Sequence, residues 1–167
     1  MQFASVTLAG VFAGFLITVL VLELSMRDAS GVVYTQVRHV ELIALDVLAT
    51  AILVPAIAAT ATVTVMRYRA GGSGRRLMAS ALLLMVLVVA VTVLVNLPIN
   101  ADQHGWVVTA PPPDWADIRD RWQLAHALRT AAAVIALGCL AIGTSTSTTD
   151  SAPTVRRDTR ARCRAWP

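Results

Sequence analysis

Four long stretches of uncharged, mainly apolar residues dominate this sequence, at residues 3–21, 47–66, 77–95 and 130–144. An α-helix of about 20 apolar residues crosses the hydrocarbon core of a bilayer, and it satisfies its own backbone hydrogen bonds there. The sequence therefore predicts an all-α, four-helix transmembrane bundle with an extension of loop and helix on the outer side. The predicted spans cover about 3–24, 44–66, 77–96 and 122–144.

The composition excludes the other broad classes of protein. Charged residues make up 14% of the chain and apolar residues 56%, and the mean hydropathy is +0.66. A soluble globular domain carries about 25% charged residues, and disorder requires low hydrophobicity. The two cysteines do not form a disulfide framework. We therefore expect a single membrane domain over residues 1–144, with the lipid bilayer as its surroundings.

The basic residues, all of them arginines, concentrate in the loop at 67–76 and in the tail at 156–164. They do not form a basic face on a soluble domain, so no nucleic-acid partner is expected. An even number of spans puts this loop and both termini on one side, which the positive-inside rule assigns to the cytoplasm. We predict a multi-pass protein of the cell membrane with a disordered, basic cytoplasmic tail at 145–167. A homo-oligomer is compatible with so small a bundle.

Two asparagines enclose a proline at the outer end of the third span, in the sequence N-x-P-x-N at 96–100. Asn96 has apolar neighbours in the chain, so its amide needs hydrogen-bond partners at that depth. Pro98 disfavours helical geometry at the residue before it. It is therefore expected to end the third helix.

A further helix is predicted to begin near Trp115, outside the membrane, and to continue into the fourth span. Helical periodicity places four of its side chains on one face: Trp115, Trp122, His126 and Arg129. An ionisable residue at membrane depth usually faces the bundle interior. Alternatively, Arg129 extends to the lipid headgroups and the two tryptophans form an interfacial belt. The shared face of all four residues favours the interior.

A similar polar stretch, at residues 34–46, leads into the second span. One helix from about Val32 through the second span is compatible with this pattern. An apolar stripe is formed by Val33, Val37, Val40 and Ala44, whereas another face carries Thr35, His39 and Asp46. His39 is a candidate acid or base because its ordinary pKa lies near neutrality. A hydrogen-bonded surface histidine, or an Arg38–Glu41 ion pair, explains this stretch equally well.

Histidines and carboxylates supply the ligand types of a metal site, but their spacing forms no metal-binding motif. The side chains concerned are His39, Glu41, Asp46, His104 and His126. No two of the histidines are three or four residues apart, as helical metal ligands commonly are. We therefore expect no metal.

The N-x-P-x-N sequence at 96–100, followed by W-x3-H-x2-R at 122–129, resembles the anthrone-oxygenase-like family of small four-span membrane proteins. The resemblance covers residues 95–143, with Trp115 and Arg121 included, and is loose before that. The segment at 103–113 departs from the family pattern in length, which affects the shape of an outer pocket.

The resemblance implies oxidation of a polycyclic aromatic anthrone to a quinone by O2, without a cofactor. It implies two partners, an apolar aromatic molecule and O2. We expect His126, with His39 as second choice, to take the substrate proton. Arg129, Asn96 and Asn100 would donate hydrogen bonds to the substrate oxygen as it gains negative charge. Trp115 and Trp122 would form the slot for the flat substrate. The alternative is a non-catalytic membrane protein that binds or passes an apolar metabolite, or an accessory subunit.

Overall fold

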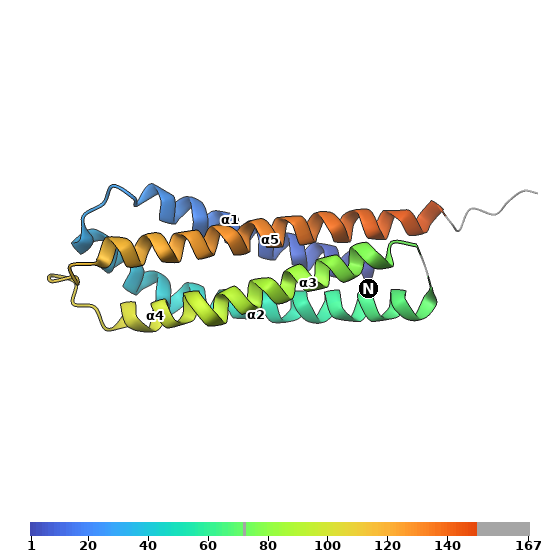
Figure 1. The fold of residues 1–167 in the computed structure, drawn as a ribbon, viewed down its shortest axis with the longest axis horizontal. Coiled ribbons are helices and arrows are strands. Elements are labelled where there is room, and N and C mark those ends of the chain that lie inside the picture. Colours follow the sequence, from blue (N-terminus) through green and yellow to red (C-terminus); the bar gives the residue numbers. More distant parts are fainter. Residues whose placement is uncertain (72, 150–167) are drawn as a thin grey trace, which may run out of the picture.

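The computed structural model describes residues 1–71 and 73–149. They form long helices, and long helices that follow each other in the chain lie antiparallel (Figure 1). The elements are α1 (Gln2–Ser25), α2 (Gly31–Ala70), α3 (Arg75–Val91), the π-helical segment η1 (Thr92–Asn96), α4 (Leu97–His104) and α5 (Trp115–Thr149). Within these described residues, four helical segments are long and apolar enough to cross a membrane. The predicted all-α, four-helix bundle is confirmed.

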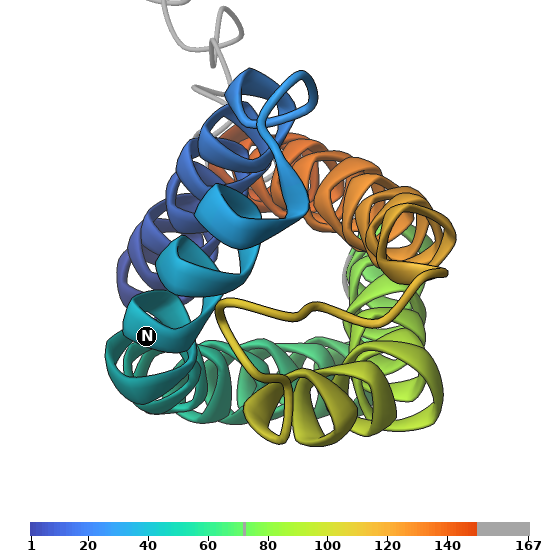
Figure 2. The same ribbon diagram turned by 90° about the vertical axis from the view of Figure 1, so that its left-hand side faces the viewer.

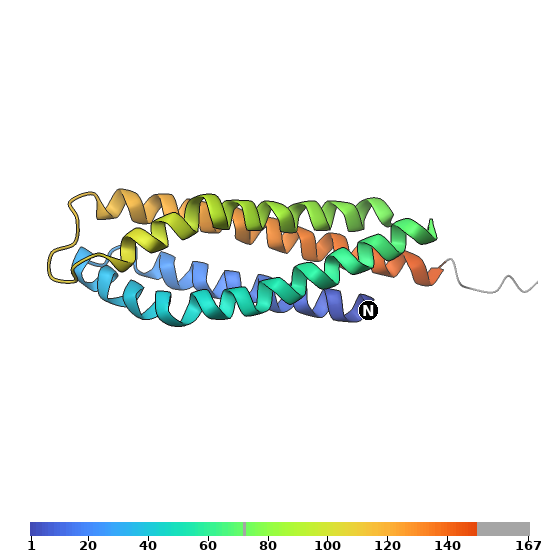
Figure 3. The ribbon, with the colours of Figure 1, turned by 90° about the horizontal axis from the view of Figure 1, so that it is seen from below.

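The helices form a ring in which each one packs against two main neighbours (Figure 2). Helix α5 lies between α1 and α3, and α2 closes the ring between the same two helices. The N-terminus and the turn between α2 and α3 lie at one end of the bundle, here called the terminal end (Figure 3). The connections at 26–30 and 105–114 lie at the opposite end, here called the loop end. The assignment of the terminal end to the cytoplasm stays a prediction.

An apolar core fills the half of the bundle nearer the terminal end. Its buried residues include many small side chains, among them Ala13, Ala56, Ala81, Ala133 and Ala136. Large apolar side chains instead cover the outside, such as Val47 at 71% exposed and Leu94 at 74% exposed. A bilayer solvates such an apolar surface, and small residues at the helix contacts let the backbones approach closely.

Helix α2 turns its apolar stripe outward. Val33 and Val40 are exposed, whereas Tyr34, Arg38 and Glu41 are buried. In a bilayer the apolar face of a helix can contact lipid, so the polar face turns toward the bundle interior. The interior of the loop half is consequently polar.

The third span continues past Pro98, contrary to the expectation that this proline ends the helix. The chain passes from α3 through the π-helical segment η1 directly into α4, and Pro98 lies in the first turn of α4. A π-helical turn changes the hydrogen-bond pattern from i→i−4 to i→i−5, so a proline that follows it disrupts the backbone ladder less. The helical path therefore reaches His104.

Helix α5 begins at Trp115, as predicted, and continues to Thr149. Its last residues thus enter the segment that the sequence assigned to the tail. The remainder of the predicted disordered tail, 150–167, lies outside the described residues.

We expect that Gly31→Ala destabilises the protein by about 1–3 kcal/mol, the usual range for overpacking. Gly31 begins α2, and an added Cβ would lie 2.9 Å from ring atoms of Trp115 and 3.0 Å from Cγ of Pro111. The measurement is the unfolding free energy in detergent. Gly14→Ala is the matched control, because no atom beyond the adjacent residues and backbone of its own helix lies within 4 Å of its added Cβ. Equal stability of the two variants would contradict this packing argument.

Candidate functional site

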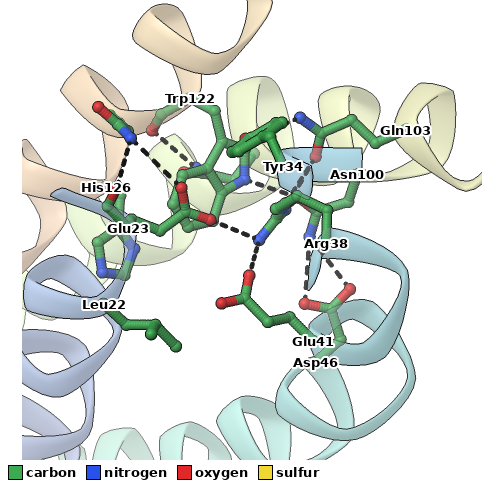
Figure 4. A network of polar contacts seen from close by, with 12 residues as sticks. Leu22, Glu23, Tyr34, Arg38, Glu41, Asp46, Asn100, Gln103, Trp122 and His126 are labelled. Atoms are coloured by element: carbon green, nitrogen blue, oxygen red, sulfur yellow. Dashed lines mark hydrogen bonds and ion pairs between the residues drawn. The ribbon is translucent and has the colours of Figure 1, made fainter. Parts of the chain in front are cut away.

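Arg38 is the centre of a buried network in the loop half of the bundle (Figure 4). Its side chain is 3% exposed, and its Nη1 donates to Oε1 of Glu23 at 2.9 Å and to Oε2 of Glu41 at 2.8 Å. Its Nε and Nη2 both donate to Oε1 of Gln103, and Nη2 also donates to Oδ1 of Asn100. This one guanidinium therefore connects α1, α2 and α4.

The acceptors around Arg38 have further partners of their own. The side-chain amide of Gln123, on α5, donates to the backbone oxygen and to Oε2 of Glu23. The amide of Gln103 donates to the hydroxyl of Tyr34 at 3.3 Å. Buried polar groups are costly unless they are hydrogen-bonded, so these contacts stabilise the network.

Trp122 contacts the network from α5. Its indole Nε1 donates to Oδ1 of Asn100 at 2.7 Å, and its ring lies 4.4 Å from the guanidinium carbon of Arg38. The amide nitrogen of Asn100 donates to both carboxylate oxygens of Asp46 at 3.1 Å. Asn100 thus joins an indole, a guanidinium and a carboxylate at one point.

His126 and Arg129 form the next layer, toward the apolar core. The His126 ring stacks on Trp122, with a centroid separation of 4.8 Å and an interplanar angle of 7°. Its Nε2 lies 2.9 Å from the backbone oxygen of Leu16, and its Nδ1 accepts from Nε of Arg129 at 2.9 Å. The Leu16 contact requires the proton on Nε2, so Nδ1 is the acceptor. Both ring nitrogens are therefore engaged.

Arg129 retains hydrogen-bonding capacity. Besides the bond from Nε, its Nη2 lies 2.6 Å from Nδ1 of His126 and its Nη1 donates to the hydroxyl of Thr92 at 3.2 Å. A guanidinium carries two N–H groups on each terminal nitrogen. Each terminal nitrogen therefore keeps one N–H for a ligand.

A cavity of about 90 Å³ adjoins both layers. Its polar lining consists of Arg38, Glu41, Asp46, Thr50, Thr92, Asn100, His126 and Arg129, and Trp122 and residues such as Phe12, Phe15 and Leu45 supply the aromatic and apolar wall. The arrangement combines an apolar wall with charged groups that are held in place by hydrogen bonds. Such a combination is typical of small-molecule sites.

Helices α2 and α4 contribute residues of their outer surface to the cavity lining. Two of its lining residues, Thr50 and Leu97, are exposed. Their neighbours on the outer surface, such as Val47 and Leu94, are apolar, and both helices belong to predicted membrane spans. The cavity thus adjoins the apolar outer surface of α2 and α4, whereas the loop at 105–114 crosses the loop end of the bundle (Figure 2).

The predicted site residues divide into two groups. His126, Arg129, Asn100 and Trp122 line the cavity together. Outside the lining lies Asn96, whose amide donates to the backbone oxygen of Trp122 at 3.4 Å and thereby ties η1 to α5.

The other two predicted site residues lie nearer the loop end. Nε2 of His39 lies 3.1 Å from the backbone oxygen of Gln103. Trp115 shares the helix face of Trp122 but is two turns away, where it packs on Tyr34 at 5.7 Å and under Arg119 at 5.0 Å. Neither residue lines the cavity, and the functional roles of all these residues stay predictions.

Sequence reasoning missed Glu23, Arg38, Gln103 and Gln123 as site residues. The Arg38–Glu41 pair was one of the alternatives for residues 34–46, and the structure contains it as a buried ion pair. A signal was present in the sequence, because Tyr34, Arg38 and Glu41 recur at helical spacing beside an apolar stripe. In a membrane helix, such a polar stripe marks the inward face.

Comparison with known protein families gives a match. The family model described as anthrone oxygenase matches residues 44–139, which is more than half of the chain. The chain belongs to the anthrone oxygenase family. No curated protein and no solved structure matches it.

The part of the chain matched to the anthrone oxygenase family contributes most of the cavity's polar groups. Asp46, Asn100, Trp122, His126 and Arg129 lie within it. Glu23, Arg38 and Glu41 precede it. Among the described residues, no group of three histidine, cysteine or acidic side chains is arranged to hold a metal ion.

Proposed function

We propose that this anthrone oxygenase family member oxidises an anthrone-like polycyclic aromatic to a quinone, with O2 as the oxidant. The observation that carries the proposal is the cavity between Trp122, Arg129 and the Arg38 network, whose lining includes Thr50 and Leu97, two residues exposed on the outer surface of the bundle. Both an apolar aromatic and O2 partition into the bilayer, so a site next to the outer surface receives both from the same phase.

The chemistry of the substrate requires little from the protein. An anthrone has a doubly benzylic methylene across the central ring from the carbonyl, and the two flanking aromatic rings conjugate the two positions. Removal of one methylene proton therefore gives an electron-rich carbanion that reduces O2 directly. The protein supplies a base, donors to the carbonyl oxygen as it gains charge, and an apolar slot. Arg129 supports the donor role through its remaining N–H groups, and the ring of Trp122 supports the slot.

The predicted role of His126 as the base requires a rearrangement. Its Nδ1 accepts from Arg129 and its Nε2 is bonded to Leu16. Arg129 would have to turn away before Nδ1 accepts a substrate proton. In the present arrangement, His126 instead positions Arg129 and Trp122.

The size of the cavity limits how the substrate binds. Its 90 Å³ is smaller than the roughly 150 Å³ that accommodates benzene in an engineered apolar cavity. A substrate of three fused rings therefore requires α2 and α4 to separate, or keeps part of its ring system in the bilayer. The exposed positions of Thr50 and Leu97 support the second arrangement.

The test is quinone formation by the purified protein in lipid nanodiscs. We expect anthrone to be converted to anthraquinone in the presence of O2, faster than in empty nanodiscs, and we expect the rate to persist with a chelator. Loss of activity with a chelator would overturn the cofactor-free mechanism. Absence of conversion with retained anthraquinone binding, measured by tryptophan fluorescence, would overturn the enzymatic proposal and favour the binding alternative.

A further inference from the structure

Glu41 has an unusual position for a carboxylate. It is 6% exposed, lies within the second membrane helix and lines the cavity. Its Oε2 accepts from Arg38 at 2.8 Å, whereas its Oε1 is buried and has no hydrogen-bond partner in the described part of the chain. In Figure 4 this free oxygen points away from Arg38. A buried acceptor without a partner costs about 1–3 kcal/mol, so this oxygen lowers the stability of the fold and is available to a ligand.

The other candidate bases of the cavity are already engaged. Both ring nitrogens of His126 have partners. The two oxygens of Asp46 both accept from the amide of Asn100. His39 is not part of the lining, and its Nε2 contacts the backbone of Gln103. Glu41 is thus the lining residue with a basic atom that is both buried and unpartnered.

The charge of the network also favours proton uptake. Of the described residues in and beside the cavity, three carry carboxylates, Glu23, Glu41 and Asp46, and two carry guanidiniums, Arg38 and Arg129. If all are ionised, the network has one excess negative charge. Buried unpaired charge is costly, so the arrival of one proton on a carboxylate brings the network to neutrality.

We propose that Oε1 of Glu41 is the proton acceptor of the reaction, a proposal that rests on the proposed function. The substrate's methylene C–H bond breaks, its electron pair passes into the conjugated carbonyl, and the proton forms an O–H bond on Glu41. O2 then oxidises the carbanion and a C–O bond forms, and the terminal peroxide oxygen recovers that proton. Glu41 takes the second methylene proton as the O–O bond breaks and passes it to the departing hydroxide. Anthrone and O2 thus become anthraquinone and water.

The test isolates the proton step from the oxidation. Protein in nanodiscs is incubated with anthrone in D2O without O2, and deuterium uptake at the methylene is followed by mass spectrometry. Wild-type protein is expected to accelerate uptake over empty nanodiscs, and Glu41→Gln to lower that acceleration by about 10²–10⁴-fold, the usual contribution of a general base. Glu41→Asp, which keeps a carboxylate on a shorter chain, is expected to retain part of it.

Two controls separate a catalytic role from a structural one. Asp102→Asn makes the same carboxylate-to-amide change outside the cavity, where Asp102 accepts a hydrogen bond from Trp106. This variant should accelerate deuterium uptake by anthrone as the wild type does. Glu41→Gln should still bind anthraquinone, because its amide oxygen can accept from Arg38. Loss of both exchange and binding would indicate a structural role and overturn the proposal.

The remaining outcomes distinguish the two proposals. If Glu41→Gln accelerates deuterium uptake by anthrone as strongly as the wild type does, and His126→Gln does not accelerate it, the proton acceptor is His126 and not Glu41. Quinone formation by the wild type would leave the proposed function standing in that case. A wild-type protein that produces neither exchange nor quinone above empty nanodiscs would overturn the proposed function itself.

Discussion

Arg38→Met is expected to lower the free energy of unfolding by about 3–5 kcal/mol, the range for removing one partner of a buried ion pair. The substitution leaves Glu23 and Glu41 buried without a cation, and it removes the donors to Gln103 and Asn100. The measurement is the unfolding free energy in mixed micelles, with loss of helical circular dichroism as the signal. An effect below about 1 kcal/mol would contradict this account of the network.

The matched variants test whether charge is the cause. In the triple variant Arg38→Met, Glu23→Gln, Glu41→Gln, no charge is left unpaired, so most of the lost stability should return. Arg76→Met removes an exposed arginine at the terminal end and should change stability by no more than about 0.5 kcal/mol. A triple variant as unstable as Arg38→Met would show that lost packing, and not unpaired charge, is responsible.

The second large effect is expected at Arg129. If its free N–H groups stabilise the substrate oxygen as charge develops, Arg129→Met should lower kcat by about 10²–10³-fold, as the loss of one such donor usually does. An interaction made only in the transition state changes kcat and leaves KM nearly constant. The measurement is steady-state quinone formation in nanodiscs.

Arg129→Lys separates charge from geometry. Lysine keeps the positive charge but lacks the planar fork that contacts both His126 and Thr92, so an intermediate kcat is expected. Anthraquinone binding should persist in both variants. A wild-type kcat in Arg129→Met would remove the oxygen-stabilising role from Arg129.

The family and the fold class follow from features that are local in the sequence. Uncharged stretches of membrane-spanning length predict helices wherever they occur, because backbone groups in lipid must be satisfied within the segment. The start of α5 at Trp115 was also predictable, since three prolines precede it. The passage of the third span through η1 was not, because whether a proline ends a helix depends on the hydrogen-bond pattern of the turn before it.

Part of the site was predictable because its residues share one helix. Trp122, His126 and Arg129 follow each other at helical spacing, which places them on one face whatever the partner helices are. The same rule did not separate Arg38 from His39, which are adjacent in the sequence but differ by about 100° around the helix axis. Only the packing of α2 decides that Arg38 faces the interior and His39 contacts the edge of α4.

The number of spans, the face shared by Trp122, His126 and Arg129, and the family could be inferred from the sequence, since hydropathy and periodicity are properties of short segments. The tertiary structure alone decided that a carboxylate of α1, a guanidinium of α2 and amides of α4 and α5 form one buried network. The hydrogen bonds of this network join residues as far apart in the chain as Glu23 and Gln123. Their partners are chosen by the burial cost of each charge in the assembled bundle, which no single segment contains.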